Sequence, residues 1–484
     1  MGAAGTLSCV PAALFVGLHI RKTDDIAYLC TMTTDQFVAE HREGDVRQLA
    51  FLASRYPDVD MPYALDQIAG WQTARRKLPS WAACPGIVYP PHLSMEQCSS
   101  EATARYKAAV VSRLVAGASH PTVMADFTGG FGVDFSFLSR GFDSAFYIEH
   151  SERLAATTTG NLRALGIDHA TTLTGEAEDI LPTLPHLTLA YLDPARRDGH
   201  GGRTVAIADC TPDVCALWPE LSAKADRIVL KLSPMLDWHK AVADLGGSIC
   251  EVHAVAVAGE CKELLLVADL TAPTTDRPLL HCIDIRPDRT ITFTCRDTDN
   301  TIVPVAGETD IRPGARLYEP SAPIMKIGCF AALAERYGLR TVAPNSHLFV
   351  GSEGDGVCNE GINDGEDVCD EGILDGGNAN NGSGAADFPG RRFIIDRVST
   401  MNKKELRTAL SGITKANIAV RNFPMTADAL RRKLRLADGG DTYLFATTDA
   451  AGRHVIVVGH KDFTSNESRR ETSQSTSPVG KHRS

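Results

Sequence analysis

A short apolar segment that runs directly into a glycine-rich turn constrains the fold of this chain more than any other feature. The segment Val123–Ala125 ends in Asp126, and the turn that follows carries Gly129, Gly130 and Gly132 before a stretch with helical spacing. Glycine is needed where a strand turns sharply into a helix and where the backbone passes close to a ligand. The segment therefore predicts a strand–turn–helix unit whose turn binds a nucleotide-type ligand.

Two more apolar segments also end in acidic residues. The segment Ala145–Ile148 ends in Glu149, which stands 17 residues beyond the last glycine of the turn. A carboxylate at that distance can accept hydrogen bonds from both hydroxyls of a ribose. The segment 187–192 ends in Asp193, and Pro194 follows it. These two acids strengthen the expectation of a nucleotide-type ligand.

Strand and helix patterns alternate over residues 120–270, as a parallel sheet with crossover helices requires. The last two predicted strands read as an antiparallel pair that closes the sheet. Residues 1–100 instead space apolar residues three and four apart, which predicts helices, with a capping box at Ser94 and Gln97. The predicted strands are 123–126, 145–149, 170–174, 188–193, 227–232, 249–257 and 263–270.

The glycine turn, the acid that closes the second strand and the Asp-Pro pair that closes the fourth together resemble the class I S-adenosylmethionine methyltransferases. A dinucleotide-binding domain is the alternative, but its three glycines stand at a different fixed spacing and it requires no Asp-Pro on a later strand. The resemblance implies a Rossmann-like α/β sheet with S-adenosylmethionine as the cofactor.

The resemblance also implies which residues hold the cofactor. Asp126 and the turn would surround the methionine end, Glu149 would take the ribose hydroxyls, and Glu176 would lie near the adenine. A salt-bridged surface position is the simpler alternative for Glu149. The implied cofactor-binding residues are Asp126, Thr128, Gly129, Gly130, Gly132, Glu149 and Glu176.

The Asp193-Pro194 pair indicates the reacting centre, but its neighbours leave the target atom open. Amino-methylating relatives have Asn/Asp-Pro-Pro-aromatic, whereas Ala195 and Arg196 stand here instead. Carbon-5 uracil methyltransferases are nearer in motif but need a nucleophilic cysteine. Cys250 and Cys261 are candidates by position only, because small buried cysteines are the commoner explanation.

A third comparison concerns the FtsJ-like ribose 2′-O-methyltransferases, which use a Lys–Asp–Lys–Glu tetrad. Four residues occur in the same order and at comparable spacing in this chain. A lysine among carboxylates can take the proton of a ribose hydroxyl while the acids hold it. Ordinary helix and strand-end lysines are the alternative. The predicted catalytic residues are Lys107, Asp193, Pro194, Lys231 and Glu263.

The order of domains resembles that of bacterial methyltransferases with a THUMP-like domain. Arg421-Asn-Phe-Pro, the run 430–434 and the segment 439–448 carry this resemblance, which covers residues 30–460 without the acidic insertion. THUMP domains bind RNA, so the resemblance implies an RNA substrate. The predicted domains are a helical region at 1–100, a methyltransferase domain at 101–275, a ferredoxin-like α+β domain at 276–352, an acidic insertion at 353–390, a basic THUMP-like domain at 391–462 and a disordered tail at 463–484.

Charge is distributed unevenly along the chain. Residues 391–461 carry fourteen Lys or Arg against six Asp or Glu, although the whole chain has a net charge of −11. A basic face of this kind binds phosphates without reading sequence, and a merely solvated helix face is the alternative. Arg196 and Arg197 also suit a phosphate. The predicted RNA contacts are Arg196, Arg197, Lys403, Lys404, Arg407, Arg431, Arg432, Lys433 and Arg435.

The remaining features set limits on the class of protein. Residues 353–376 carry nine Asp or Glu and no Lys or Arg, which favours a solvated loop over the calcium site that the repeat also permits. Thirteen cysteines without a Cys-x-x-Cys pair indicate reduced thiols rather than a metal site, and we expect a cytoplasmic protein without a membrane span or an obligatory protein partner. A scaffold that binds RNA without turnover and a small-molecule methyltransferase are the alternative functions.

Overall fold

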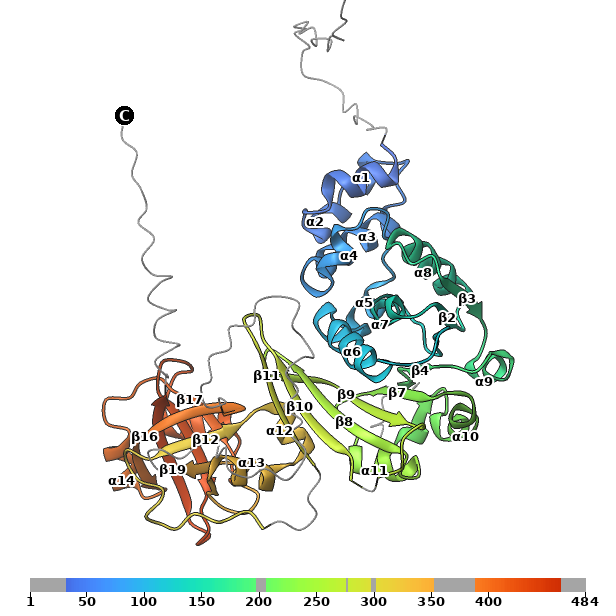
Figure 1. Ribbon diagram of the computed structural model, residues 1–484. Coiled ribbons are helices and arrows are strands. Elements are labelled where there is room, and N and C mark those ends of the chain that lie inside the picture. The colour runs from blue at the N-terminus through green and yellow to red at the C-terminus, as the bar shows by residue number, and fades with distance from the viewer. Residues whose placement is uncertain (1–31, 197–205, 276, 297–301, 352–387, 463–484) are drawn as a thin grey trace, which may run out of the picture. The chain divides into compact units, whose positions relative to one another are not determined.

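The computed structural model describes residues 32–196, 206–275, 277–296, 302–351 and 388–462 (Figure 1). The acidic repeat, the C-terminal tail and Arg197 lie outside these ranges. The chain divides into two units, Met1–Thr73 and Ala74–Ser484, and each is described by itself. Within the described residues no helix has the length and apolar character that crossing a membrane requires.

The first unit is helical, as the sequence predicted. Thr33 and Gln36 form a capping box at the start of α1, and the Asp45 side chain caps α2. Phe37 is fully buried at the centre of a small apolar core. The helices are α1 (Thr34–His41), α2 (Val46–Ala50), the short 3-10 helix η1 (Ala53–Arg55) and α3 (Met61–Lys77), whose end lies in the second unit.

A nine-stranded sheet in the order β11-β10-β8-β9-β7-β4-β1-β2-β3 forms the first half of the second unit. Strands β1, β2, β3, β4 and β7 run parallel, whereas β9 pairs antiparallel with both β7 and β8. The strands are β1 (Val123–Asp126), β2 (Ser144–Glu149), β3 (Ala170–Thr174), β4 (Leu189–Leu192), β7 (Arg227–Leu232), β8 (Ile249–Val257), β9 (Glu260–Asp269), β10 (Leu279–Ile285) and β11 (Thr290–Arg296).

Helices cover both faces of this sheet, which is why its central strands are apolar throughout. On one face α6, α7 and α8 pack against residues such as Met124 and Leu189, and on the other face α10 and α11 pack against Ala125 and Ala190. The helices are α4 (Pro79–Ala83), α5 (His92–Gln97), α6 (Glu101–Leu114), α7 (Val133–Leu138), α8 (Glu152–Ala164), α9 (Ala177–Ile180), α10 (Val214–Lys224) and α11 (Trp238–Asp244).

The start of α5 differs from the prediction. The helix begins at His92 with Pro91 at its N-cap, and no side chain caps it, so the capping box predicted for Ser94 and Gln97 is wrong. The physical reason is that the chain enters helical geometry directly after Pro91, which places Ser94 inside the helix rather than before it.

The sheet is longer than the sequence indicated. Strand β10 pairs in parallel with β8 from Leu279 beside Glu251 to Ile285 beside Val257, and β11 pairs with β10. The predicted boundary at residue 276 therefore divides strands that share one sheet. An apolar alternation marks a strand but does not identify the strand with which it pairs.

A seven-stranded sheet in the order β13-β14-β12-β16-β19-β18-β17 contains strands from both of the predicted C-terminal domains. Strand β16 joins them, because it pairs with β12 on one side and with β19 on the other. The strands are β12 (Arg316–Pro320), β13 (Arg340–Thr341), β14 (Phe349–Gly351), β16 (Gly390–Thr400), β17 (Asn417–Val420), β18 (Tyr443–Thr448) and β19 (His454–Lys461).

Two short helices follow β12, namely α12 (Ala322–Ile327) and α13 (Phe330–Tyr337). Gly328 ends α12 in the left-handed conformation, with a φ of 86°, which glycine adopts at little cost. The Trp238 Nε1 group donates a hydrogen bond to the Ile327 carbonyl at 3.1 Å. This contact joins α12 to α11 beside the nine-stranded sheet.

Helices α14 (Lys403–Ala409) and α15 (Ala427–Leu434) cover the same face of the seven-stranded sheet. Leu406 of α14 and Leu430 of α15 pack in one apolar cluster with Leu444 and Ile456 of the sheet. The intervening residue Phe445 belongs to the cluster on the opposite face. The polar sides of both helices therefore face away from the same side of the sheet.

Candidate active site

The glycine turn follows β1, as predicted, and each glycine has a steric or conformational reason. A Cβ atom on Gly129 would lie 2.8 Å from the Ile148 carbonyl oxygen, and one on Gly132 would lie 2.5 Å from Thr158 Cγ2. Gly130 and Gly132 have positive φ angles of 56° and 76°. Larger residues would force the turn away from β2 and α8.

Glu149 ends β2 and faces this turn. Its Oε2 accepts a hydrogen bond from Gly130 N at 2.8 Å, and its Oε1 accepts one from Ser151 N at 2.9 Å. Its Oε1 also lies 3.1 Å from Nδ1 of the exposed His150. A carboxylate offers about four acceptor sites, so Glu149 can still accept from a further donor such as a ribose hydroxyl. The residue is buried and bonded to the turn, and its acceptor chemistry fits the implied cofactor.

Thr128 connects Asp126 to Asp193 through hydrogen bonds. Asp126 Oδ1 accepts from Thr128 N at 2.9 Å and from Thr128 Oγ1 at 3.2 Å. The Thr128 hydroxyl oxygen accepts in turn from Asp193 N at 2.6 Å. Burial, with the charges of Asp134 and Asp193, raises the pKa of Asp126 to about 8 despite the bonds from Thr128.

Glu176 has a looser place in the site. It is exposed at the N-cap of α9 and makes no capping hydrogen bond with its side chain. The preceding residue, Gly175, donates its N–H to the Glu149 carbonyl at 3.2 Å. The backbone of this turn therefore meets the end of β2, while the role of the Glu176 side chain remains a prediction.

Lys107 lies at the bottom of the site and has no exposed surface. Its Nζ group contacts Glu263 Oε1 and Oε2 at 2.9 and 2.8 Å, Ser99 Oγ at 2.9 Å and Asp134 Oδ1 at 3.0 Å. Helix α6 supplies Lys107, β9 supplies Glu263 and α7 supplies Asp134. The ammonium group is surrounded by the protein, so it cannot reach a substrate.

Lys231 lies at the end of β7, nearer to the surface. Its Nζ group is 2.5 Å from Asp193 Oδ2 and 3.8 Å from Asp134 Oδ2. Burial alone would lower the pKa of Lys231, but the carboxylates of Asp193, Asp134 and Glu263 raise it above the ordinary value. Lys231 is therefore a charged hydrogen-bond donor at neutral pH.

Asp134 links the two lysines, and the sequence analysis missed it. Its carboxylate contacts Lys107 and Lys231 and accepts hydrogen bonds from Tyr191 OH and Ser99 Oγ, each at 2.8 Å. Burial opposes its ionisation, yet the two lysines and these hydroxyls lower the pKa of Asp134. The signal in the sequence was an acid only two residues after Gly132, within an otherwise apolar helix start.

We call Lys107, Asp134, Asp193, Lys231 and Glu263 the charge cluster. The structure brings together all four residues of the predicted tetrad, with Lys107 paired to Glu263 and Lys231 paired to Asp193. Asp193 has the most accessible side chain of the five, at 37% exposed, against 11% for Lys231. A substrate would therefore meet Asp193 first, with Lys231 behind it.

The segment after Asp193 is only partly described. Pro194 is buried, and Ala195–Arg196 forms the short strand β5, which pairs with β6 (Cys210–Thr211). Neither candidate cysteine suits a nucleophilic role. Burial raises the pKa of Cys250 and of Cys261 to about 11, so both remain thiols at neutral pH.

A second group of predicted residues lies on α14 and α15. Six of them are exposed, and none of these six side chains makes a hydrogen bond or an ion pair with another described residue. Arg431 differs, because it donates to the Ala416 carbonyl at 3.0 Å and pairs with Asp438 at 2.7 Å. We call the exposed six the basic surface: Lys403, Lys404, Arg407, Arg432, Lys433 and Arg435.

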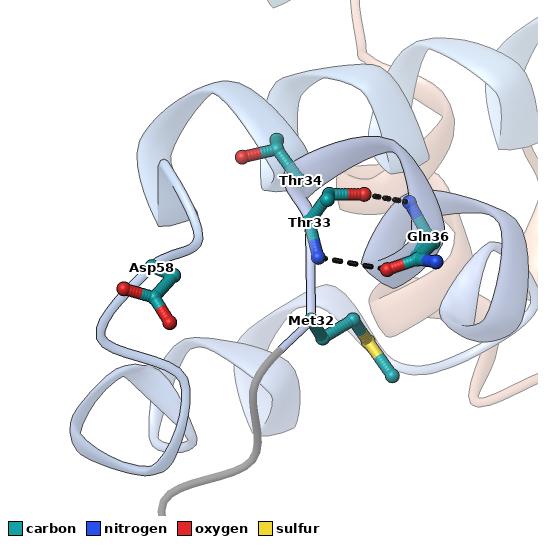
Figure 2. A pocket seen from close by; sticks show the side chains of 5 residues that line it. All are labelled: Met32, Thr33, Thr34, Gln36 and Asp58. Carbon is teal, nitrogen blue, oxygen red and sulfur yellow. Dashed lines mark hydrogen bonds between the residues drawn. The ribbon is translucent and has the colours of Figure 1, made fainter.

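An open hollow in the first unit is unrelated to either group. Met32, Thr33, Thr34, Gln36 and Asp58 line it (Figure 2). Thr33 and Gln36 already bond each other there, with Thr33 N donating to Gln36 Oε1 at 2.9 Å and Gln36 N donating to Thr33 Oγ1 at 3.3 Å. These groups serve the start of α1.

Comparison with known proteins agrees with the fold. Residues 390–461 match a family model described as THUMP domain-like, and residues 317–355 match one described as a ferredoxin-like domain. A solved protein from Porphyromonas gingivalis W83, provisionally assigned as a methyltransferase, is 28% identical, with a TM-score of 0.71 over 90% of this chain and 100% of its own. A search of curated proteins gave no match.

Two further solved structures cover about a third of the chain. An rRNA methylase from Streptococcus thermophilus is 12% identical, with a TM-score of 0.25 over 33% of this chain and 93% of its own. A precorrin-6y C5,15-methyltransferase from Geobacter metallireducens GS-15 is 19% identical, with a TM-score of 0.25 over 34% of this chain and 86% of its own. Similarity at this level does not bear on function.

Proposed function

We propose that this chain, a class I methyltransferase by fold with ferredoxin-like and THUMP-like parts, transfers a methyl group from S-adenosylmethionine to RNA. The observation that carries the proposal is the Asp193–Lys231 pair at the carboxyl ends of β4 and β7. The backbone of Asp193 is tied through Thr128 to the glycine turn. The accessible acid and the implied cofactor site are thus parts of one hydrogen-bonded unit.

The residues present fit the cofactor. Glu149 can accept from a ribose hydroxyl, and the turn has no side chains at positions 129, 130 and 132. When bound, S-adenosylmethionine supplies an electrophilic methyl group. The remaining requirement is a nucleophile held with its lone pair toward that methyl group, and this is the task of the protein's own side chains.

We assign to Asp193 the task of accepting the proton of the substrate's nucleophilic group. Lys231 keeps its proton and holds Oδ2, so the acid rather than the lysine accepts the hydrogen of a substrate N–H or O–H. The resemblance to ribose methyltransferases had instead predicted that a lysine takes this proton. The deeper pair of Lys107 and Glu263 does not reach substrate and serves, through Asp134, to hold Lys231 in place.

The basic surface supports RNA as the substrate. Six exposed cations on two helices of the THUMP-like region are free to contact phosphates, which need no sequence-specific geometry. A small-molecule substrate would leave these residues without a function. The target atom is a ribose oxygen or a base nitrogen. Identifying the labelled nucleoside after methyl transfer would distinguish the two.

The test is transfer of a tritiated methyl group to total bacterial RNA by the full chain and by Asp193→Asn. We expect label in RNA with the wild type, little with the variant, and unchanged calorimetric binding of S-adenosylmethionine by both. Cofactor binding without label in RNA would refute the RNA substrate. Absence of cofactor binding by the wild type would refute the methyltransferase assignment and leave an RNA-binding scaffold.

A further inference from the structure

Three buried metal-ligating side chains lie together on β8 and β10. Glu251 and His253 are two residues apart on β8 and so point to the same face of the sheet. His281 of β10 stands directly opposite His253 in the parallel pairing. One ligand atom from each residue lies within 4.8 Å of the others, and all three residues are buried.

Both histidines are held so that one ring nitrogen faces the glutamate. The Nδ1 atom of His253 is 2.7 Å from Tyr106 OH, and the Nδ1 atom of His281 is 3.1 Å from Thr294 Oγ1. The Nε2 atoms then lie 2.9 and 3.8 Å from Glu251 Oε2. A second partner on the far nitrogen is the usual support of a metal-binding histidine.

His281 supplies an independent sign of a missing ligand. Its Nε2 atom has no hydrogen-bond partner among the described residues, although the residue is only 3% exposed. A buried polar atom without a partner is destabilising.

Arg113 contacts the proposed ligand Glu251, so a metal ion would bind beside a guanidinium group. Its guanidinium donates to Glu251 Oε1 at 2.9 Å and to Oε2 at 2.6 Å. Glu251 Oε2 also contacts His253 Nε2 at 2.9 Å, so an ion would take the place of that contact and bind a remaining acceptor site of the carboxylate. Arg113 offsets the charge of Glu251, so a divalent ion would add two charges, as zinc bound by three neutral histidines does.

We propose that Glu251, His253 and His281 bind a divalent transition-metal ion, with zinc the best match to two imidazoles and one carboxylate. The ion would join β8 to the β10 extension of the sheet. It would also fix α6, because Tyr106 contacts His253 and the next residue is Lys107 of the charge cluster. The sequence predicted no metal site because ligands 28 residues apart on two strands form no local motif.

The experiment uses the full chain without an affinity tag, stripped of metal with a chelator and titrated with zinc against a chromophoric competitor. Cobalt then reports the ligand type by its absorption spectrum. We expect one ion per chain and a cobalt spectrum without a thiolate charge-transfer band. Less than one ion per wild-type chain, or a thiolate band showing that cysteines bind the ion, would overturn the proposal.

Three variants test whether zinc binds at this site. Thr294→Val removes only the partner of His281 and should weaken zinc binding roughly 10- to 100-fold. His281→Gln removes a ligand and should weaken zinc binding further, whereas exposed His186→Gln should leave it unchanged. If His281→Gln and the wild type bind zinc equally, the ion lies elsewhere and the proposal fails. The wild-type cobalt spectrum decides the question even if a variant does not fold.

Discussion

The charge cluster and the basic surface use the same residue types in opposite environments. Lys107 and Lys231 are 0% and 11% exposed and contact carboxylates, whereas Lys403 and Lys404 are exposed and make no ion pair with a described residue. A buried ammonium group needs its partners, while an exposed one remains available to a ligand. This difference supports the proposed roles, in which the first region would hold the reacting acid and the second would hold a polyanion.

The largest loss of stability should follow from replacing Lys107, the fully buried residue of the charge cluster. Lys107→Met would leave Glu263 and Asp134 buried without their shared cation. Removing one partner of a buried pair typically costs about 3–5 kcal/mol. Urea unfolding of the variant should show a loss of this size in the free energy of unfolding.

The control is the exposed pair of Lys240 with Asp244, which lies one turn apart on α11. Lys240→Met should cost only about 0.3–0.5 kcal/mol. Equal costs at Lys107 and Lys240 would show that the buried pairing does not stabilise the fold.

Asp193→Asn should reduce methyl transfer with little change in stability. The residue is the accessible end of the charge cluster, and an amide cannot take a proton from the nucleophile. Proton transfer by a positioned side chain contributes roughly 10²–10⁴-fold. Single-turnover rates at saturating RNA and cofactor measure this loss, and a rate within twofold of the wild type would exclude Asp193 as the acceptor.

The contribution of the basic surface should appear in the salt dependence of the affinity for RNA. Neutralising Lys403, Lys404, Arg432 and Lys433 to alanine removes up to four phosphate contacts. Each contact contributes about 0.7 to the slope of log affinity against log salt for single strands, so the slope should fall by about 3. Lys240→Ala with Lys262→Ala is the matched control on exposed lysines that pair with acids. An unchanged slope in the fourfold variant would place the RNA elsewhere.

A smaller effect concerns pH. The folded pKa of Asp126 is raised to about 8, above its unfolded value of roughly 4, so the folded state binds more protons between these values. Its contribution to stability is therefore complete below pH 4 and is lost as pH rises through 8. Asp126→Asn should flatten the fall in unfolding free energy between about pH 4 and pH 8. An equally steep fall in the variant would contradict the raised pKa.

Local features were predicted from the sequence, whereas contacts across the sheets were predicted only for the tetrad. The glycine turn, Glu149 and the Asp193-Pro194 pair follow directly from strand ends, and the seven strands from 123 to 270 appeared where expected. The internal bonding of Arg431 depends on Ala416 and Asp438, which only folding brings near.

The same reason explains the larger misses. Asp134 is recognisable as a link only when α6, α7 and β9 meet around Lys107. Strand β10 pairs with β8, and this pairing places His281 beside His253. The apolar pattern of each segment predicts a strand but does not indicate which strand it pairs with. Spacing along the chain predicts strand ends, and the resemblance to ribose methyltransferases predicted the tetrad of distant side chains, but neither identified Asp134 as the carboxylate between the two lysines.

The measurement that tests the comparison most directly is a paired kinetic analysis of two variants on the same RNA. Asp193→Asn should lose the single-turnover methyl-transfer rate while the Kd for RNA stays within about twofold of the wild type. The fourfold alanine variant of the basic surface should raise the Kd for RNA and keep the rate at saturating RNA. If both variants changed the rate and the Kd together, the division between a reacting cluster and a binding surface would be wrong.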